Sequence, residues 1–551
     1  MHLYFFSTIL PWITLLAWIV FVGGAAALIL KSASAIKKMP LAITLAIISI
    51  QVIAIVVRFA WVPDDHRIYF DEDRYLSYAV TFARFGQAVS VDVATPAKSI
   101  IGIPDDAGRT TVPVFNAIIM RTFGFTEHAL YQAARVFHSA SVTGIFILGY
   151  LLFGSYLIGL IGAAGIAILP TPVFFSPSFG LDVYFMDLGI WALIATLLFS
   201  RKPTSLTGAW WIAATILFLC VRIESYVFLP VIAYLYVLES KKRKQLVFTK
   251  IRTVILILLL IFIAVRGVMS LTVLMKPWCC AEALPLESFS LSYTIRHILP
   301  NIFALFSRLE FPWIISALAG YALFRYTTPV IRLLGLWILL YFFTYSSYYA
   351  GLFFNPEFSG SYGRYLLMLI PPLLLLCGYT IQSWINGLQK TPAGNSKTTL
   401  LIILCLASLI PTALRYRTLI TYSPWDAAAE LGPRYVHSFL TDEVIAKTPP
   451  DAIIIHNLTA PILLAGKSVV FTSSFLTEKI AQEFVLNSLR QEKRVFMLPH
   501  YRCILYPDSC EDIMRQFRTV PLLKKNFGEG ASLELYELHL IASPGAKAIS
   551  D

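Results

Sequence analysis

The chain has 551 residues, of which 57% are apolar and only 14% are charged. Soluble globular proteins carry about 25% charged residues, so this composition excludes a string of soluble domains for most of the chain. Aromatic residues make up 14%, and no glycine period runs through the sequence, which excludes a disordered or collagen-like protein. The net charge of +12 raises nucleic acid as a partner, and where the charges lie decides that question.

Long apolar segments recur from Phe6 to about Arg415. A membrane-spanning helix needs about 20 apolar residues, and we predict about twelve spans on this basis. They cover residues 8–30, 40–60, 131–152, 154–173, 181–200, 207–221, 224–239, 253–270, 311–326, 332–350, 364–385 and 398–416. The first span lacks a basic leading segment and a small-residue cleavage site, so we expect a retained helix rather than a signal peptide.

The basic residues are concentrated in alternate loops between these predicted spans. Alternate loops hold 15 basic residues and a single acid, Glu239. Because the cytoplasmic loops of membrane proteins are rich in Lys and Arg, we expect these loops to face the cytoplasm. Both termini and the loops near 61–130, 174–180, 271–310 and 351–363 then face outward. The basic excess therefore indicates topology, and nucleic acid is not needed to explain it.

The tail from about residue 421 to 551 has a different pattern, with 13 basic and 15 acidic residues. Short apolar runs at 452–455, 469–471 and 494–497 predict buried strands, and 477–490 predicts an amphipathic helix. Strands that alternate with helices favour a small α/β domain. We therefore expect a polytopic α-helical membrane part over 1–420, which includes the outer loop 61–130, and a soluble α/β domain over 421–551 on the outer face.

The seven cysteines divide by their expected location. Three fall in predicted spans, where they pack as small apolar residues: Cys220, Cys377 and Cys405. Four fall on the outward side, where oxidation is permitted: Cys279, Cys280, Cys503 and Cys510. A Cys503–Cys510 bridge is plausible, and the pairing of the other two stays open. No Cys or His spacing indicates a zinc site, and His66, near the acidic loop, is expected to be an ordinary surface residue.

The outward loop after the second span concentrates acids, among them Asp71, Glu72 and Asp73. Downstream, an apolar face and a terminating glycine predict a helix at the membrane interface, built on Leu76, Ala79, Val80, Ala83 and Gly86. A carboxylate at its N-terminus can accept a proton from a nucleophile at the membrane surface or help to hold a divalent cation. Simple complementarity to the helix dipole explains Asp71 and Glu72 equally well.

Other polar residues stand at the same outward level. Asp182 and Asp187 lie in the first turns of the 181–200 span, where acids are costly and usually functional, and Asp187 is the deeper of the two. Arg222 and Glu224 lie at an outward turn, where a structural ion pair accounts for them equally well. Arg364 opens the 364–385 span, and its guanidinium suits a lipid-linked phosphate. Interfacial anchoring is the alternative for Arg364.

The pattern Asp71-Glu72-x-x-Tyr75, followed by Ala79 and Gly86, resembles the first outer loop of the GT-C glycosyltransferases. The nearest branch is that of the protein O-mannosyltransferases and aminoarabinose transferases. Further matches occur in order over roughly residues 40–385: Val112-Pro113-Val114-Phe115-Asn116, Phe123-Gly124, Arg135, Leu152-Phe153-Gly154, Ser176-Pro177 before Asp182, and Arg364-Tyr365-Leu366-Leu367 before Pro371-Pro372. Each motif alone is weak, and the resemblance rests on their order and shared side.

The resemblance implies a membrane glycosyltransferase. Such an enzyme moves a sugar from a polyprenyl- or dolichyl-phosphate donor to an acceptor hydroxyl on a glycan, lipid or protein, with inversion, at the outer face of a bacterial inner membrane. It also implies that Asp71 is the base and that Glu72 orients the acceptor or a metal. The donor-phosphate residues would be Arg364, Tyr365, Arg109 and Arg222. The acceptor or sugar residues would be Tyr75, Asp182, Asp187 and Glu224.

Two departures from the family pattern stand out. The aminoarabinose transferases carry Lys-Pro-Pro where this chain has Thr111-Val112-Pro113, so Arg109 is the candidate to replace that phosphate-binding lysine. The first span also precedes the usual family start and implies one extra helix. Because of both departures, the sequence does not identify the donor or the acceptor. It also does not identify the sugar, the lipid carrier, the metal dependence or the oligomeric state.

Two alternative functions are considered beside the leading one. One is a ligase or polymerase of lipid-linked glycans, and the other is a non-enzymatic transporter of lipid or sugar. A transporter would show broken helices or inverted repeats with polar sites at the membrane midplane. Here the titratable residues gather in the outer loop and at outer helix ends, which favours chemistry at the surface.

Overall fold

Helices make up most of the structure. The computed structural model describes residues 4–36, 39–67, 69–104, 108–243, 250–274, 289–348, 351–355, 361–388, 407–421, 433–499, 507–526 and 532–541. Within these ranges, eight helical segments meet the length and apolarity that a membrane span requires. They are Phe5–Lys31, Leu41–Trp61, Glu127–Phe153, Leu181–Arg201, Ile223–Lys242, Lys250–Val268, Pro329–Ser346 and Arg364–Gly387. The prediction of a polytopic α-helical membrane protein is confirmed.

The eight segments coincide with eight of the predicted spans. Three other predicted spans form apolar helices that are shorter than expected: α7 (Tyr156–Ile168), α10 (Ser205–Leu219) and α14 (Trp313–Arg325). Most of the last predicted span, 398–416, lies outside the described residues. The remaining helices of this part are α2 (Leu10–Ile36), α3 (Leu41–Val56), α5 (Thr111–Phe123), α6 (Glu127–Phe153), α8 (Pro170–Phe174), α9 (Leu181–Arg201), α11 (Leu229–Lys242), α12 (Lys250–Leu274), α13 (Leu291–Ser307), α15 (Pro329–Ser346), α16 (Ile370–Leu388) and α18 (Tyr416–Thr421). Short 3-10 and π turns extend several of them: η1 (Phe5–Ile9), η2 (Val57–Trp61), η3 (Ile223–Phe228) and η4 (Arg364–Leu369).

Helix α9 is the centre of the helical part, with nearly every side chain buried. Glycines let neighbouring helices approach closely, as is typical of membrane helices. A Cβ atom on Gly159 of α7 would lie only 2.6 Å from the carbonyl oxygen of Phe146 in α6. At one end of the bundle, Arg201 of α9 donates to Glu239 of α11 at 2.9 Å and to the carbonyl of Leu151 in α6 at 2.6 Å. The ends of α6, α9 and α11 therefore meet on one side.

The loop after the second long helix lies at the opposite end, which we call the loop end. It forms α4 (Tyr69–Phe85) and the antiparallel strands β1 (Val89–Thr95) and β2 (Lys98–Pro104). The predicted helix is confirmed, and Gly86 ends it with φ +73°, its N–H bonded to the carbonyl of Phe82. The apolar face with Leu76 and Val80 is fully buried by protein.

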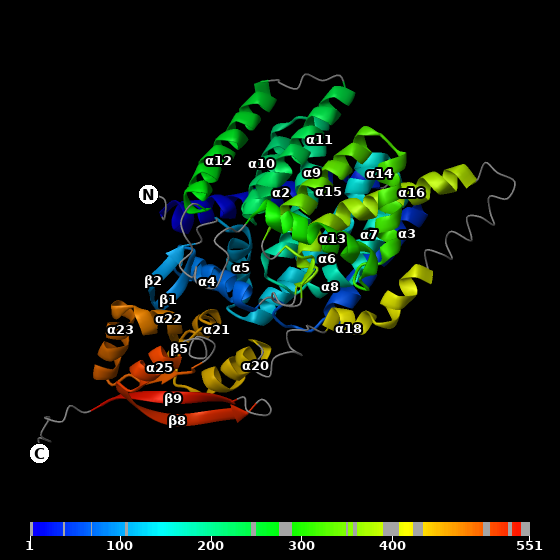
Figure 1. The fold of residues 1–551 in the computed structure, drawn as a ribbon. Coiled ribbons are helices and arrows are strands. Elements are labelled where there is room, and N and C mark those ends of the chain that lie inside the picture. The colour runs from blue at the N-terminus through cyan, green and yellow to red at the C-terminus, as the bar shows by residue number, and fades with distance from the viewer. Residues whose placement is uncertain are drawn as a thin grey trace, which may run out of the picture.

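The tail forms a mixed α/β unit, which Figure 1 draws in orange and red beside α4, β1 and β2. Its helices are α20 (Pro433–Ser438), η5 (Phe439–Ile445), α21 (Ala460–Leu464), α22 (Thr472–Thr477), α23 (Lys479–Arg490) and α25 (Pro507–Met514), and its strands are β5 (Ile453–His456), β6 (Ser468–Phe471), β7 (Val495–Met497), β8 (Phe517–Asn526) and β9 (Ser532–Leu540). The three predicted strands and the predicted helix are all present. The β8–β9 hairpin was not predicted.

One seven-stranded sheet joins the loop to the tail. Its strand order is β2-β1-β6-β5-β7-β9-β8, with parallel pairing only among β6, β5 and β7. Val93 of β1 pairs with Val470 of β6 in antiparallel register. Because the pairing uses main-chain hydrogen bonds, the tail is fixed to the loop end and not tethered by the chain alone.

The cysteines that the structure describes agree with their expected roles. Cys220 and Cys377 are buried. Cys510 is disulfide-bonded, and its predicted partner Cys503 lies outside the described residues, as do Cys279, Cys280 and Cys405.

Candidate functional site

Asp71 and Arg364 meet at the loop end although 293 residues separate them in the chain. Nη1 of Arg364 donates to Oδ2 of Asp71 at 3.1 Å. The Asp71 side chain keeps 49% exposure, whereas that of Arg364 keeps 12%. The first turn of α4 therefore presents an accessible carboxylate against a largely buried guanidinium. Nε of Arg364 is buried and has no hydrogen-bond partner among the described residues.

Two tyrosine rings support the guanidinium. Arg364 donates to the hydroxyl of Tyr365 at 2.7 Å and lies over its ring, 4.8 Å from the centroid. The ring of Tyr345 stacks on that of Tyr365 with centroids 4.7 Å apart, and both rings are buried. A cation over an aromatic face is stabilised by the ring quadrupole. This packing holds Arg364 in place and brings Tyr345 against Tyr365.

A second arginine also lies near the Tyr365 ring, with the guanidinium carbon of Arg222 5.9 Å from the centroid. Arg222 makes a two-point ion pair with Glu224, at 2.9 and 3.2 Å, and also donates to Asp182. All three side chains are at most 14% exposed. Arg222 is thus compensated by two carboxylates, which leaves Arg364 as the arginine whose carboxylate partner is exposed.

Arg109 and Tyr75 complete this group. Nη1 of Arg109 donates to the hydroxyl of Tyr75 at 3.2 Å, and its guanidinium lies 5.5 Å from the centre of that ring. Tyr75 lies one helical turn after Asp71 on α4, so it stands on the same side of that helix as the Asp71–Arg364 contact. The predicted residues that the structure gathers here are Asp71, Tyr75, Arg109, Asp182, Arg222, Glu224, Arg364 and Tyr365, and we call them the Asp71–Arg364 cluster.

Glu72, the next residue to Asp71, lies in a separate network. Its side chain is fully buried and accepts hydrogen bonds from Nδ1 of His66 at 2.9 Å, from the main-chain N–H of Arg67 at 3.0 Å and from the hydroxyl of Ser178. Burial lowers the pKa of His66, but the charges of Glu127 and Glu72 outweigh that effect and raise it to about 10. This geometry favours a positioning role for Glu72 over contact with an acceptor. It also corrects the expectation that His66 lies on the surface, since His66 is 3% exposed.

Asp73 points in a third direction. Its carboxylate accepts from the main-chain N–H groups of Ala460 at 3.1 Å and Thr459 at 3.4 Å, at the start of α21 in the tail. Burial raises the pKa of Asp73 to about 7. The carboxylates of Asp71, Glu72 and Asp73 therefore have separate partners and do not converge on one cation.

Asp187 does not join the Asp71–Arg364 cluster. It is fully buried on a different face of α9 from Asp182. Its carboxylate pairs with Nδ1 of His138 in α6. A buried acid paired with a histidine from a neighbouring helix accounts for the anomaly that the sequence raised. The contact of Asp187 with an acceptor stays a prediction, and its pairing with His138 does not favour it.

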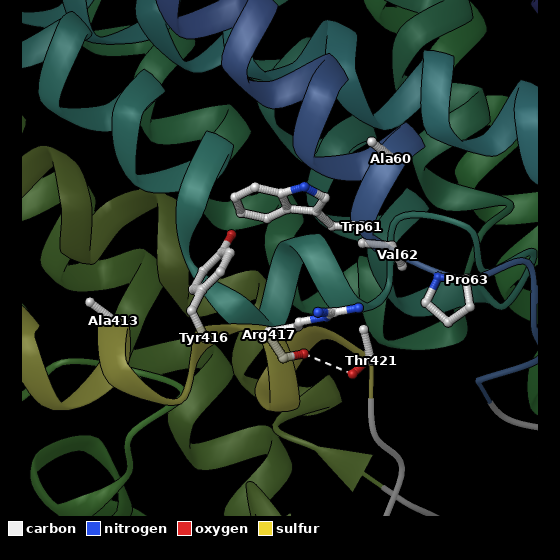
Figure 2. A pocket seen from close by; sticks show the side chains of 8 residues that line it. All are labelled: Ala60, Trp61, Val62, Pro63, Ala413, Tyr416, Arg417 and Thr421. Atoms are coloured by element: carbon white, nitrogen blue, oxygen red, sulfur yellow. Dashed lines mark hydrogen bonds between the residues drawn. The ribbon is translucent and has the colours of Figure 1, made fainter.

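A hollow of about 950 Å³ lies elsewhere, between the end of η2 and α18. Figure 2 shows Trp61 and Tyr416 with Arg417 around it, and the hydroxyl of Thr421 donating to the carbonyl oxygen of Arg417 at 2.8 Å. Its lining residues are Ala60, Trp61, Val62, Pro63, Ala413, Tyr416, Arg417 and Thr421. None of them is a predicted site residue.

Comparison with solved structures finds the same architecture. The crystal structure of ArnT from Cupriavidus metallidurans in the apo state matches with a TM-score of 0.58 and 12% identity, over 90% of this chain and 98% of that one. The structure of the same protein bound to undecaprenyl phosphate matches with a TM-score of 0.53 and 13% identity, over 89% and 97%. No protein-family model and no curated protein sequence matches the chain.

ArnT is a GT-C aminoarabinose transferase, and the match runs through nearly its whole length. It covers 90% of this chain, and the predicted fold class is confirmed. At this level of identity the likeness concerns the fold. The protein therefore has the fold of the GT-C membrane glycosyltransferases.

Proposed function

We propose that this protein transfers a sugar from a polyprenyl-phosphate donor to an acceptor hydroxyl at the loop end. The observation that carries the proposal is the Asp71–Arg364 pair, which sets an accessible carboxylate beside a cation in a membrane protein with the GT-C fold. The ArnT structure with undecaprenyl phosphate supports a lipid phosphate as the donor class. We further propose that the acceptor is a glycan, a lipid or a protein. The transfer inverts the configuration at the anomeric carbon of the sugar.

Asp71 acts as the general base in this scheme. Its carboxylate takes the proton of the acceptor hydroxyl as the acceptor oxygen forms a bond to the anomeric carbon of the sugar. The bond from that carbon to the phosphate oxygen breaks, and the lipid phosphate leaves with the electron pair. Half exposure of Asp71 leaves room for an acceptor, and the ion pair with Arg364 fixes the carboxylate on the first turn of α4.

Arg364 binds the donor phosphate. A guanidinium forms strong, directional hydrogen bonds to phosphate oxygens, and Arg364 lies within 3.1 Å of the base. Arg109 lies in the same group and takes the place of the family's missing lysine, while Arg222, already paired with Glu224 and Asp182, adds positive charge nearby. Tyr75, Asp182 and Glu224 would then border the sugar and acceptor.

The test is a transfer assay with the full chain. Membranes that contain the protein receive undecaprenyl phosphate carrying a radiolabelled sugar, and the label that leaves the lipid and enters any acceptor is counted. We expect transfer by the wild type and a loss of at least 100-fold in Asp71→Asn, since general base catalysis contributes about 10²–10⁴-fold.

Asp451→Asn is the matched control because Asp451 is an exposed acid of the tail. Donor binding is measured in parallel and should persist in Asp71→Asn. Near-normal turnover in Asp71→Asn removes Asp71 as the base. Movement of labelled lipid across the bilayer without transfer to an acceptor favours the transporter instead.

A further inference from the structure

Outside the Asp71–Arg364 cluster, one group of three side chains in the described parts of the chain has the geometry of a metal site. It combines His66 before α4, Glu127 at the first position of α6, and His437 on α20 of the tail. Nε2 of His66 lies 3.5 Å from one carboxylate oxygen of Glu127, and Nε2 of His437 lies 3.1 Å from the other. One donor atom from each residue lies within 4.8 Å of the other two.

The two histidine spacings to Glu127 are close to those between ligands of one zinc ion. Zinc binds histidine nitrogen and carboxylate oxygen at about 2.0–2.2 Å, so two ligands at tetrahedral angles lie roughly 3.3–3.5 Å apart. Two imidazoles and one carboxylate form a donor set that suits zinc and other first-row divalent ions. The ring centroids of His66 and His437 are 4.5 Å apart and their planes are inclined at 67°, so the rings converge without stacking face to face.

Glu72 supplies the supporting contact that such a site needs. It accepts from Nδ1 of His66 at 2.9 Å, so a metal ion would displace the proton of Nε2, which faces Glu127, and leave the other proton on Nδ1. Metal-bound histidines usually donate their second N–H to a carboxylate in this way. The His66 ring is also held by Phe179, edge to face at 5.0 Å.

Charge and topology favour an ion here as well. Glu72 is fully buried and Glu127 is 17% exposed, so a divalent cation would offset two carboxylates in a region with little water. The three ligands come from three segments that the chain brings together over 371 positions, and His437 is the contribution of the tail. A metal ion would therefore tie the tail to the first turn of α4 and to the start of α6.

We propose that His66, Glu127 and His437 bind a divalent transition metal such as zinc, which clasps the tail onto the loop end. Water completes the coordination. The site is structural, because it joins three segments of the chain, and it is separate from the proposed transfer reaction. Its loss loosens the tail and the N-terminus of α4 without removing any residue of the Asp71–Arg364 cluster.

The experiment measures zinc on the purified full chain in detergent. Protein treated with EDTA and desalted is titrated with zinc chloride, and bound zinc per chain is measured by mass spectrometry of the element. We expect one tightly bound zinc per wild-type chain and at least a tenfold weaker affinity in His437→Ala and Glu127→Gln. His128→Ala is the matched control, because His128 is the neighbouring residue of α6 and its side chain is 72% exposed.

A second readout separates metal binding from folding. Zinc should raise the thermal unfolding midpoint of the wild type and of His128→Ala but not that of a folded His437→Ala. A wild type that takes up no zinc and shows no change in midpoint overturns the proposal and leaves a metal-free ion-pair cluster. Equal loss of zinc in His128→Ala and His437→Ala also overturns it. Transfer activity is not part of this readout, so failure of the metal site and failure of the proposed reaction are distinguishable.

Discussion

Asp71 and Glu72 are consecutive residues whose carboxylates lie in opposite environments. Asp71 is half exposed and pairs with Arg364, whereas Glu72 is fully buried and accepts from His66, Arg67 and Ser178. On a helix, neighbours in sequence point about 100° apart, so an acidic pair can divide between two tasks. Here one acid faces the candidate reaction space, and the other fixes the helix that carries it.

The first prediction concerns the buried member of this pair. Glu72→Gln should destabilise the protein by about 1–3 kcal/mol, because it leaves buried donors without their charged acceptor. Asp71→Asn should cost about 1 kcal/mol or less, since its ion pair is half exposed. Thermal unfolding midpoints in detergent with EDTA present measure the difference without a contribution from metal. A larger loss in Asp71→Asn than in Glu72→Gln would contradict this division.

The second prediction concerns Arg364. Arg364→Ala should weaken binding of undecaprenyl phosphate at least tenfold, because a hydrogen bond to a charged group contributes about 1.5–3 kcal/mol. Arg364→Lys should retain part of the affinity, since it keeps the charge and loses the planar fork. Direct binding of the lipid to purified protein is the measurement.

Arg417→Ala is the control for Arg364, because Arg417 is an exposed arginine that lines the separate cavity near Trp61. It should bind the lipid as the wild type does. Unchanged affinity in Arg364→Ala would remove its phosphate role and would leave Arg109 as the next candidate.

The helical fold follows from the sequence because apolar length alone selects membrane helices. The gathering of Asp182, Arg222 and Arg364 at one end also follows, since antiparallel spans bring alternate loops together. Side-chain direction does not follow: Asp182 and Asp187 lie on one helix, yet Asp187 turns to His138. That choice depends on the packing of α6 against α9, for which the sequence carries no local signal.

Contacts between the loop and the tail were not predicted either, because they join residues that are distant in the sequence. Glu127 and His437 are 310 residues apart, and no pair of His or Cys residues at a metal-ligand spacing includes either position. The β1–β2 hairpin also went unnoticed, although Val89, Val91 and Val93 alternate with other residues at a strand's period of two. That alternation is the sequence signal for β1.

The third prediction is a pH dependence at the contact between Asp73 and α21. The pKa of Asp73 is about 7 in the folded protein, mainly through burial, and about 3.9 in an unfolded chain. The folded state therefore binds more protons between these values, so the contribution of Asp73 to stability is complete below pH about 4 and is lost as pH rises through 7. Asp73→Asn should flatten this fall.

The measurement for Asp73 is the unfolding midpoint from pH 4.5 to 8 in wild type and Asp73→Asn. Because other titratable groups are common to both proteins, the difference between the two curves isolates Asp73. The wild type should lose stability relative to the variant as the pH rises. A difference that is independent of pH, or that grows in the opposite direction, would contradict the assignment.

The fourth prediction tests the close packing of α6 on α7. In Gly159→Ala the new Cβ would lie 2.6 Å from the carbonyl oxygen of Phe146, which is main chain and cannot turn away. The helices must separate, and overpacking of this kind costs about 1–3 kcal/mol. Gly320→Ala on α14 is the control, because its Cβ would meet no atom within 4 Å and alanine favours a helix. Unfolding midpoints should fall in Gly159→Ala and hold or rise in Gly320→Ala, and equal midpoints would show that α6 and α7 are not in contact at Gly159.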